Sequence, residues 1–393
     1  MSWRRALALL ALLLTAPAAP KPSARELASL GKELFFDPGL SASHTLSCAS
    51  CHDPSHAYGP PNALPAQLGG PDARAQGQRA VPSLRYVQRV PLFAEHYFDE
   101  DADESVDNGP TGGLTWDGRA RNPHEQAKLP LLSPLEMANA DEAAVVRAVA
   151  KSSYAAEFQR VFGAAILESP SAAFDALTRA LEAYQDVPAE FFPYTSKYDA
   201  YLRQATELTA QEKRGLALFE APTKGNCARC HPTGIGSSGG FPAFTDFGYA
   251  ALAVPRNRAL AANRDPKYYD LGLCGPLRTD LAGRADLCGM FRTPSLRNVT
   301  LRRTFFHNGA FHSLADALHF YVERELHPEK WYPSGAYDDL PPQYRANVNR
   351  EPPFDRKPGQ APALDDAEIA DVIAFLGTLT DGWKPPAAAA ATR

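Results

Sequence analysis

CASCH at residues 48–52 and CARCH at residues 227–231 decide the fold of this 393-residue chain. Cys-x-x-Cys-His is the attachment motif of covalent haem c. In one helical turn the two thiols share a face and can form thioethers with the porphyrin vinyl groups, and the histidine that follows binds the iron. The sequence therefore predicts two haem c groups, with thioethers and proximal iron ligands from Cys48, Cys51 and His52, and from Cys227, Cys230 and His231.

Zinc binding is the alternative use of a C-x-x-C pair. A zinc ribbon needs two such pairs that close one tetrahedral site, whereas here each pair is followed by a histidine of its own. We therefore favour haem. The remaining cysteines, Cys274 and Cys288, have no adjacent histidine, and we interpret them as a structural disulfide; their Cα separation, on which a disulfide depends, is not readable from sequence.

The first 18 residues have the pattern of a secretory signal peptide. Arg4 and Arg5 precede the apolar run 6–14, and an Ala-x-Ala site ends at Ala18. That run is too short to span a membrane, which takes about 20 apolar residues. We expect cleavage near Ala18 and no membrane span in the rest of the chain. The product is expected in the periplasm, a compartment in which disulfides persist.

Composition places the chain among ordinary globular proteins. Hydrophobic residues make up 45% of it and charged residues 22%, which argues against disorder. The net charge is −5, so nothing suggests a nucleic-acid partner. The length favours two domains.

The chain repeats one pattern before each haem motif. Ser23 to Glu26 and Thr209 to Glu212 both have capping-box spacing, and each leads into Gly-x-x-Leu-Phe and then a haem motif. Further helices are expected over residues 141–162, 172–184, 314–324 and 367–379, the last capped by Asp365, whereas strand-like alternation is sparse.

We therefore predict a mainly α protein of two cytochrome c-like domains, each carrying one covalent haem c. The N-terminal haem domain is expected over residues 19–195 and the C-terminal haem domain over residues 196–384. Residues 385–393, mostly alanine, are expected to form a disordered tail.

Methionine is scarce, with 3 in the whole chain. A haem that only transfers electrons usually has both axial positions filled, often by histidine and methionine, whereas a haem that reacts with peroxide leaves one position open. After signal removal only Met137 and Met290 remain, and neither stands in a compelling position for a ligand. The scarcity argues against a carrier with two His/Met haems.

Four segments resemble the bacterial dihaem cytochrome c peroxidases, and specifically their MauG-like branch. They are LFFDPGLSASHTLSCASCHDPSHAYG (34–59), WDGRARNPHEQAKLPLLSPLEM (116–137), CARCH, and FRTPSLRNVTLRRTFFHNGAFHSL (291–314). The resemblance implies two cytochrome c-like domains, with peroxide reacting at the N-terminal haem and electrons handled at the C-terminal haem.

The resemblance also implies roles for single residues. Trp116 matches the tryptophan between the two haems, which can relay electrons or holes, although alone it reads as a core aromatic. Gln126 and Glu136 match polar residues of the distal pocket, where a carboxylate can move a proton between peroxide oxygens. Tyr321 stands where ordinary members have a methionine ligand and MauG-like proteins have a tyrosine; its oxygen would stabilise ferric iron. His307 matches a residue near the haem that is not a ligand.

Activation-dependent relatives carry a histidine beyond the first haem motif that caps this haem when oxidised. Here the matching loop, residues 60–82, contains none, so we expect a five-coordinate N-terminal haem. His96, in the acidic insertion 95–108, is the alternative cap. The insertion's Asp99, Asp101 and Asp103 imitate a calcium loop, but the glycine and closing glutamate of an EF-hand are absent, which favours a solvated loop.

Relatives also bind calcium between their domains through an asparagine and nearby carbonyl groups. Ala80 stands at the position of this asparagine in QRAVPSL (78–84), and RRTFFHNG (302–309) is also shifted from the family pattern. The resemblance therefore leaves calcium binding open.

These observations predict a periplasmic dihaem c-type oxidoreductase that reduces hydrogen peroxide at an open N-terminal haem. Electrons would arrive through the C-terminal haem from a small cytochrome, a copper protein or a protein substrate. The alternative is MauG-like oxidative modification of a partner protein. A dihaem electron carrier without catalysis is the third reading, which the open haem and the scarce methionine disfavour.

Overall fold

The computed structural model describes residues 21–98, 105–236 and 239–385. The expected signal peptide, the aspartates at 99, 101 and 103, and residues 386–393 of the expected tail lie outside these ranges. No helix in the described ranges has the length and apolar character needed to cross a membrane.

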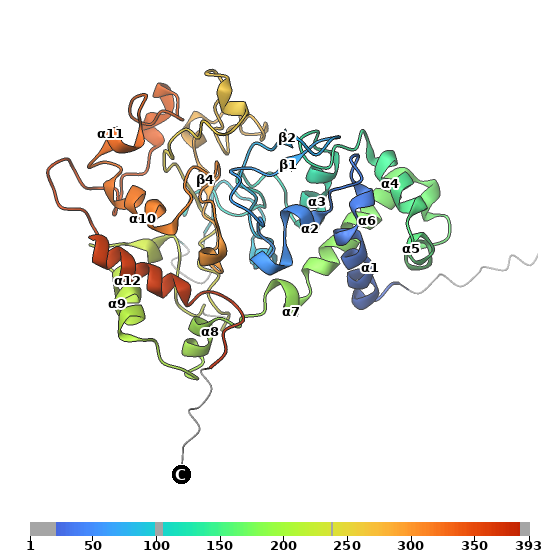
Figure 1. The fold of residues 1–393 in the computed structure, drawn as a ribbon, viewed down its shortest axis with the longest axis horizontal. Coiled ribbons are helices and arrows are strands. Elements are labelled where there is room, and N and C mark those ends of the chain that lie inside the picture. The colour runs from blue at the N-terminus through green and yellow to red at the C-terminus, as the bar shows by residue number, and fades with distance from the viewer. Residues whose placement is uncertain (1–20, 99–104, 237–238, 386–393) are drawn as a thin grey trace, which may run out of the picture.

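The described chain is mainly helical, with little strand, as expected (Figure 1). The helices that precede residue 192 lie on the right of Figure 1, and most of the later ones lie on the left. The first group is α1 (Ala24–Phe36), α2 (Cys48–Cys51), α3 (Pro123–Leu132), α4 (Glu142–Lys151), α5 (Ala155–Phe162), α6 (Pro170–Gln185) and α7 (Pro188–Phe191). The second is α8 (Lys197–Leu202), α9 (Ala210–Glu220), α10 (Leu314–Glu323), α11 (Pro328–Trp331) and α12 (Asp366–Gly377).

Two short antiparallel ladders complete the regular structure. β1 (Leu68–Gly69) pairs with β2 (Ala75–Gln76), and β3 (Tyr249–Ala250) pairs with β4 (Phe291–Arg292). Long irregular segments fill the space between the helices, in keeping with the 35 prolines of the chain.

The helix starts match the sequence predictions closely. Ser23 and Thr209 form capping boxes with Glu26 and Glu212, and Asp365 caps α12. One prediction was wrong, because the helix expected over residues 141–162 is divided into α4 and α5. The hydroxyl of Ser152 donates a 2.7 Å hydrogen bond to the carbonyl oxygen of Val149, a local bond that competes with continuing the helix.

The repeated Gly-x-x-Leu-Phe pattern marks a repeated helix crossing. α1 packs across α6 at Gly31, and α9 packs across α12 at Gly215. An ideal Cβ at Gly31 would lie 1.9 Å from the carbonyl oxygen of Ala180, and one at Gly215 would lie 1.9 Å from that of Asp371. Only a residue without a Cβ allows the two backbones to approach so closely.

Buried apolar side chains form two main clusters. One lies between Leu30 and Phe191 in the sequence and centres on α1 and α6. The other lies between Tyr198 and Leu379 and centres on α9, α10 and α12.

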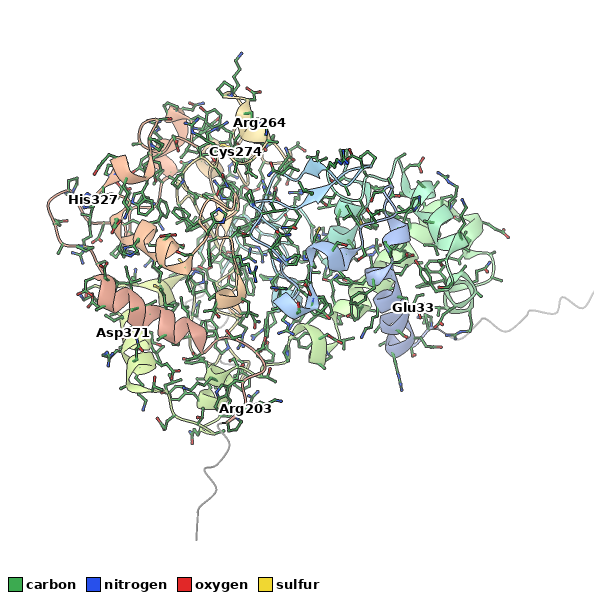
Figure 2. All side chains as sticks on the ribbon, in the orientation of Figure 1. Glu33, Arg203, Arg264, Cys274, His327 and Asp371 are labelled. Carbon is green, nitrogen blue, oxygen red and sulfur yellow. A yellow bond between two sulfur atoms is a disulfide. The ribbon has the colours of Figure 1, made fainter. Side chains whose placement is uncertain are left out.

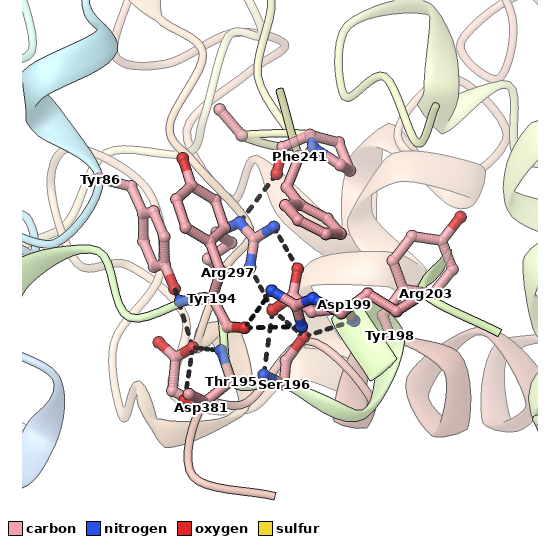
Figure 3. Close-up of polar contacts among 12 residues, drawn as sticks. Tyr86, Tyr194, Thr195, Ser196, Tyr198, Asp199, Arg203, Phe241, Arg297 and Asp381 are labelled. Atoms are coloured by element: carbon pink, nitrogen blue, oxygen red, sulfur yellow. Dashed lines mark hydrogen bonds and ion pairs between the residues drawn. The ribbon is translucent and has the colours of Figure 1, made fainter. Parts of the chain in front are cut away.

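Buried polar contacts join the two halves (Figure 3). The Tyr86 hydroxyl donates a 2.8 Å hydrogen bond to Asp381, whose other carboxylate oxygen lies 3.0 Å from Arg85. The guanidinium of Arg297 lies 4.6 Å from the centre of the Tyr86 ring and forms a buried ion pair with Asp199 at 2.8 Å. These contacts fix the orientation of the halves on which a shared site depends.

Cys274 and Cys288 form a disulfide, as predicted, with their Cα atoms 5.0 Å apart (Cys274 is labelled in Figure 2). The segment that it closes packs a small apolar cluster of Leu273, Leu281 and Leu287 against Phe93.

Candidate haem sites

The first Cys-Cys-His site lies on α2. Cys48 and Cys51 are free thiols at the two ends of this one-turn helix, and the backbone N–H of His52 donates to the carbonyl oxygen of Cys48 at 2.9 Å. The imidazole Nδ1 of His52 lies 3.1 Å from the carbonyl oxygen of Tyr58. Burial lowers the pKa of His52 to about 4, so the ring is neutral. With Nδ1–H donated to the Tyr58 carbonyl, Nε2 is the ring nitrogen that could bind a metal, and the backbone of Pro82 also lies near the imidazole.

Tyr58 reaches this position through an unusual backbone turn. Both Ala57 and Tyr58 have φ of 55°, in the left-handed region that side chains disfavour. The Tyr58 ring is fully buried, and its hydroxyl donates to Glu190 at 2.7 Å. The strained turn is thus held by core packing, and it aims the Tyr58 carbonyl at His52.

The second site repeats this arrangement on a shorter turn. Cys227 and Cys230 are also free thiols, and the backbone N–H of His231 donates to the carbonyl oxygen of Cys227 at 2.8 Å. Nδ1 of His231 lies 2.8 Å from the carbonyl oxygen of Phe244, and burial lowers its pKa to about 4.

The residues present fit haem c. Each site offers two unpaired thiols three residues apart, and a neutral imidazole whose Nδ1 is already engaged. Thioether formation and iron ligation require this donor set. The second site also opens into a largely apolar cavity, as a porphyrin requires.

Tyr321 lies in the cavity of the second site. Its side chain on α10 lines the cavity together with Cys227, Cys230 and His231. Its ring packs 5.0 Å from the Phe354 ring and 5.9 Å from the Phe306 ring. Burial, and secondarily the two thiols, raise its pKa above the ordinary value of a phenol.

Both methionines have other surroundings. Met137 is buried in the N-terminal apolar cluster, and Met290 packs against the cluster near the disulfide. The described residues that line the cavity include Tyr321 and no methionine.

Glu136 lies close to the first site. Burial, and secondarily the Glu136 carboxylate, raise the pKa of Cys51 to about 11. Desolvation raises the pKa of Glu136, and the Arg119 guanidinium opposes this. The residue is nevertheless exposed to water. That environment suits a group that exchanges protons.

Gln126 is half-buried on α3. No hydrogen bond joins its side chain to Glu136 among the described residues, and its place in the distal pocket stays a prediction.

Trp116 lies on the wall of the cavity that holds His231 and Tyr321. Its indole Nε1–H donates a 2.7 Å hydrogen bond to the carbonyl oxygen of Ala80, and its ring lies 6.5 Å from the imidazole of His307. His307 stacks on Phe291 at 3.5 Å, and burial lowers its pKa to about 3. Residues of the N-terminal half line the same cavity, so Trp116 lies where the two halves meet; among them are His56, Ala57, Gly59, Pro82, Ser83, Arg85, Tyr86 and Val87.

His96 is exposed and bonds through Nδ1 to Asp107 at 2.6 Å, so in this structure it caps no haem site. No group of three or more acidic, histidine or cysteine side chains that could hold a metal ion occurs among the described residues. At the position of the family's calcium-binding asparagine, the carbonyl oxygen of Ala80 accepts a hydrogen bond from Trp116.

Sequence reasoning missed the charged residues around Trp116. Arg79 is buried between Asp117 and Asp270, at 2.7 and 2.6 Å. Asp117 directly follows Trp116 in the WDGR motif. A carboxylate beside a core tryptophan could have indicated a buried cationic partner. For Arg292 and Arg302, which line the cavity, the sequence offered no signal beyond their place in the family-like segment 291–314.

Comparison with known proteins agrees with this geometry. The family model for di-haem cytochrome c peroxidase matches residues 25–207. The chain is 35% identical to the methylamine utilization protein MauG of Paracoccus denitrificans, over 93% of this chain and 91% of that protein. It is 28% identical to the cytochrome c551 peroxidase of Nitrosomonas europaea, over 91% of this chain and 81% of that protein.

A solved structure extends the agreement to the fold. The diheme peroxidase BthA of Burkholderia thailandensis superposes with a TM-score of 0.83 at 42% identity, covering 92% of this chain and 87% of that one. With relatives of this identity and coverage, the chain belongs to the MauG-like dihaem cytochrome c peroxidase family and is an oxidoreductase.

Proposed function

We propose that the protein reduces hydrogen peroxide at a haem held by Cys48, Cys51 and His52, with electrons delivered through a second haem held by Cys227, Cys230 and His231. The observation that carries the proposal is the difference between the two sites. The second has Tyr321 in its cavity, whereas the first has a carboxylate, Glu136, near its thiols. Iron bound at both sites supplies the redox chemistry of peroxide reduction.

At the first site His52 would bind the iron of a haem, and no second ligand is assigned there. The neutral imidazole of His52 is oriented by the Tyr58 carbonyl, and the loop 60–82 contains no histidine that could fill the opposite side. Desolvation raises the pKa of Glu136 above that of an ordinary carboxyl, which suits the group to give a proton to a leaving oxygen. Gln126 is the second polar residue that we assign to this pocket.

At the second site Tyr321 would provide an oxygen ligand. Burial raises the pKa of its phenol, and bound ferric iron would favour the phenolate. An anionic oxygen favours oxidised iron, so it would suit this site to hold an oxidising equivalent until an electron arrives from the donor.

Trp116 connects the two sites in this proposal. It lies on the cavity wall between residues of both halves and is held by its bond to Ala80. An aromatic ring between the two haem sites would divide electron transfer from one site to the other into two shorter steps. The domain limits near residue 195, the periplasmic location and a redox-protein donor belong to the same proposal.

MauG-like oxidation of a partner protein is the second candidate. It is favoured by Tyr321 and by the 35% identity to a methylamine utilization protein MauG. The two candidates share the haem sites and differ in whether the electrons come from a donor protein or from side chains of a substrate protein.

The test is to add one equivalent of hydrogen peroxide to the fully ferric protein and to record absorption and EPR spectra. Immediate two-electron oxidation of the protein without prior reduction supports the proposal. A ferric protein that reacts only after one haem has been reduced contradicts the open first site. Mass spectrometry of a co-incubated donor cytochrome then separates electron donation from covalent oxidation of the partner.

A further inference from the structure

Two half-buried arginines of the cavity have no carboxylate partner, unlike the fully buried arginines of the described chain. Arg292 and Arg302 line the cavity that contains Trp116 and Tyr321, and both are half-buried. Neither has a carboxylate oxygen within 4.0 Å among the described residues. Other arginine side chains that are at most 8% exposed each lie within 2.9 Å of a carboxylate; they are Arg79, Arg256, Arg278, Arg297 and Arg324.

Carbonyl oxygens hold both guanidinium groups in place. Nε of Arg292 donates to the carbonyl oxygen of Thr115 at 3.2 Å, and Nη2 of Arg302 donates to that of Val81 at 3.1 Å. Burial lowers the pKa of Arg302 to about 10 and also lowers that of Arg292. A cation that is partly removed from water without a counter-ion is destabilised, so each guanidinium is suited to bind an anion inside the cavity.

The carbonyl groups that hold Arg292 and Arg302 belong to residues next to Trp116 or next to its hydrogen-bond partner. Thr115 precedes Trp116, whose own carbonyl oxygen accepts from the backbone N–H of Arg292 at 2.9 Å. Val81 follows Ala80, which accepts the indole N–H of Trp116. Arg302 also lies beside the first site, because its Nη1 would be 3.9 Å from a Cβ added at Gly59, in the turn that follows His52.

We propose that Arg292 and Arg302 bind the carboxylate side arms of the two haems, Arg302 at the His52 site and Arg292 at the His231 site. A guanidinium is suited to this because its donors match a carboxylate in bidentate geometry. The inference rests on the proposed function only in requiring a haem at each site. It adds that the carboxylates neutralise two cations which would otherwise oppose the oxidation of Trp116.

Replacement of each arginine in the haem-loaded protein tests the proposal without any peroxide. Arg302→Gln and Arg292→Gln are compared with Arg302→Lys and Arg292→Lys, which keep the charge. Arg303→Gln is the matched control, because Arg303 is the exposed neighbour of Arg302. Haem content by the pyridine haemochrome assay confirms that each variant is loaded.

The first measurement is a redox titration that follows each haem by its absorption spectrum. We expect Arg302→Gln to lower the midpoint potential of the high-spin haem and Arg292→Gln that of the low-spin haem, since an unneutralised carboxylate favours ferric iron. The lysine variants are expected to shift less, and Arg303→Gln not at all.

The second measurement is redox-difference infrared spectroscopy with haem carboxylates labelled with ¹³C. We expect the label-sensitive carboxylate bands to shift in both glutamine variants and, by a smaller amount, in the lysine variants. Label-sensitive bands identical to those of the unaltered protein would overturn the proposal. So would a midpoint potential that follows added chloride or phosphate while the bands stay fixed, because the arginines would then bind a free anion.

The two proposals fail separately. Loss of the reaction with peroxide, with the carboxylate bands as expected, would contradict the proposed function alone. Normal peroxide chemistry with unshifted bands would contradict only the assignment of the arginines.

Discussion

Gly31 lies directly against the backbone of Ala180, with room for no side chain between α1 and α6. The same relationship joins Gly215 to Asp371 between α9 and α12, so one helix crossing occurs twice in the chain. An aromatic residue follows four positions later on the second helix of each pair. The Cβ atoms of Tyr184 and Phe375 lie 3.0 and 2.9 Å from where a Cβ on the facing glycine would stand. The repeat that the sequence shows as Gly-x-x-Leu-Phe is therefore a packing requirement.

Substitution of either glycine by alanine should destabilise its half of the protein. The added methyl group must push the helices apart, and overpacking of this kind costs about 1–3 kcal/mol or more. Thermal unfolding of Gly31→Ala and Gly215→Ala measures the loss. Gly377→Ala is the control, since a Cβ added there would meet no atom within 4 Å; a similar loss in the control would show that the crossing is not the cause.

The buried pair Asp199–Arg297 should make stability depend on acid. Desolvation opposes ionisation of Asp199, but hydrogen bonds and the charge of Arg297 lower its pKa in the folded state. Its stabilising contribution is therefore complete above the unfolded value of about 4 and is lost as the pH falls through the folded pKa. Breaking a buried pair costs about 3–5 kcal/mol.

We expect Asp199→Asn to lower the melting temperature markedly at pH 7. Calorimetry at decreasing pH should show the difference from the unaltered protein narrowing below about pH 4. Asp366→Asn, at a side chain that is 95% exposed, provides the control. A difference that stays constant with pH would mean that the charge of Asp199 does not stabilise the folded protein.

Glu136→Gln should slow the reaction with peroxide about 10²- to 10⁴-fold, the range of general acid–base catalysis. The substitution preserves the shape of the side chain but removes its proton-transfer capacity. Stopped-flow absorption measures the rate, and both haem spectra in the ferric state should be unchanged. Glu168→Gln, at an exposed position, is the control. A rate within twofold of that of the unaltered protein would exclude Glu136 from proton transfer.

Trp116→Phe should separate the two haems electronically while leaving the peroxide step intact. Phenylalanine keeps an aromatic ring but is far harder to oxidise and cannot donate to Ala80. Rapid-freeze EPR after peroxide addition should then show oxidation confined to the first haem. Oxidising equivalents still shared between both haems would show that electrons take another path.

The local structure could be largely read from the sequence. Capping residues such as Ser23 and Asp365 start helices through bonds within one turn, so their effect is visible in the residue order. The break between α4 and α5 depends on a side-chain bond of Ser152 that periodicity does not report. The charged residues around Trp116 come from separate parts of the chain, and only the fold brings Arg79 to Asp270.

The sequence predicts those parts of the candidate site whose residues are neighbours in the chain. Cys48, Cys51 and His52 form one turn, so their chemistry follows from spacing alone. Tyr321 lies far beyond His231 in the sequence, and its place in the same cavity depends on α10 packing over the second site. The family resemblance and the scarcity of methionine suggested Tyr321 as a ligand. Its position on the wall of the cavity supports that proposal.

Continuous-wave EPR of the resting ferric protein tests the central claim, an open first haem and a second haem completed by Tyr321. We predict one high-spin and one low-spin signal of equal intensity before any reduction, and loss of the low-spin signal's original g values in Tyr321→Phe. Two low-spin signals in the resting protein, or a spectrum that Tyr321→Phe leaves unchanged, would contradict the account.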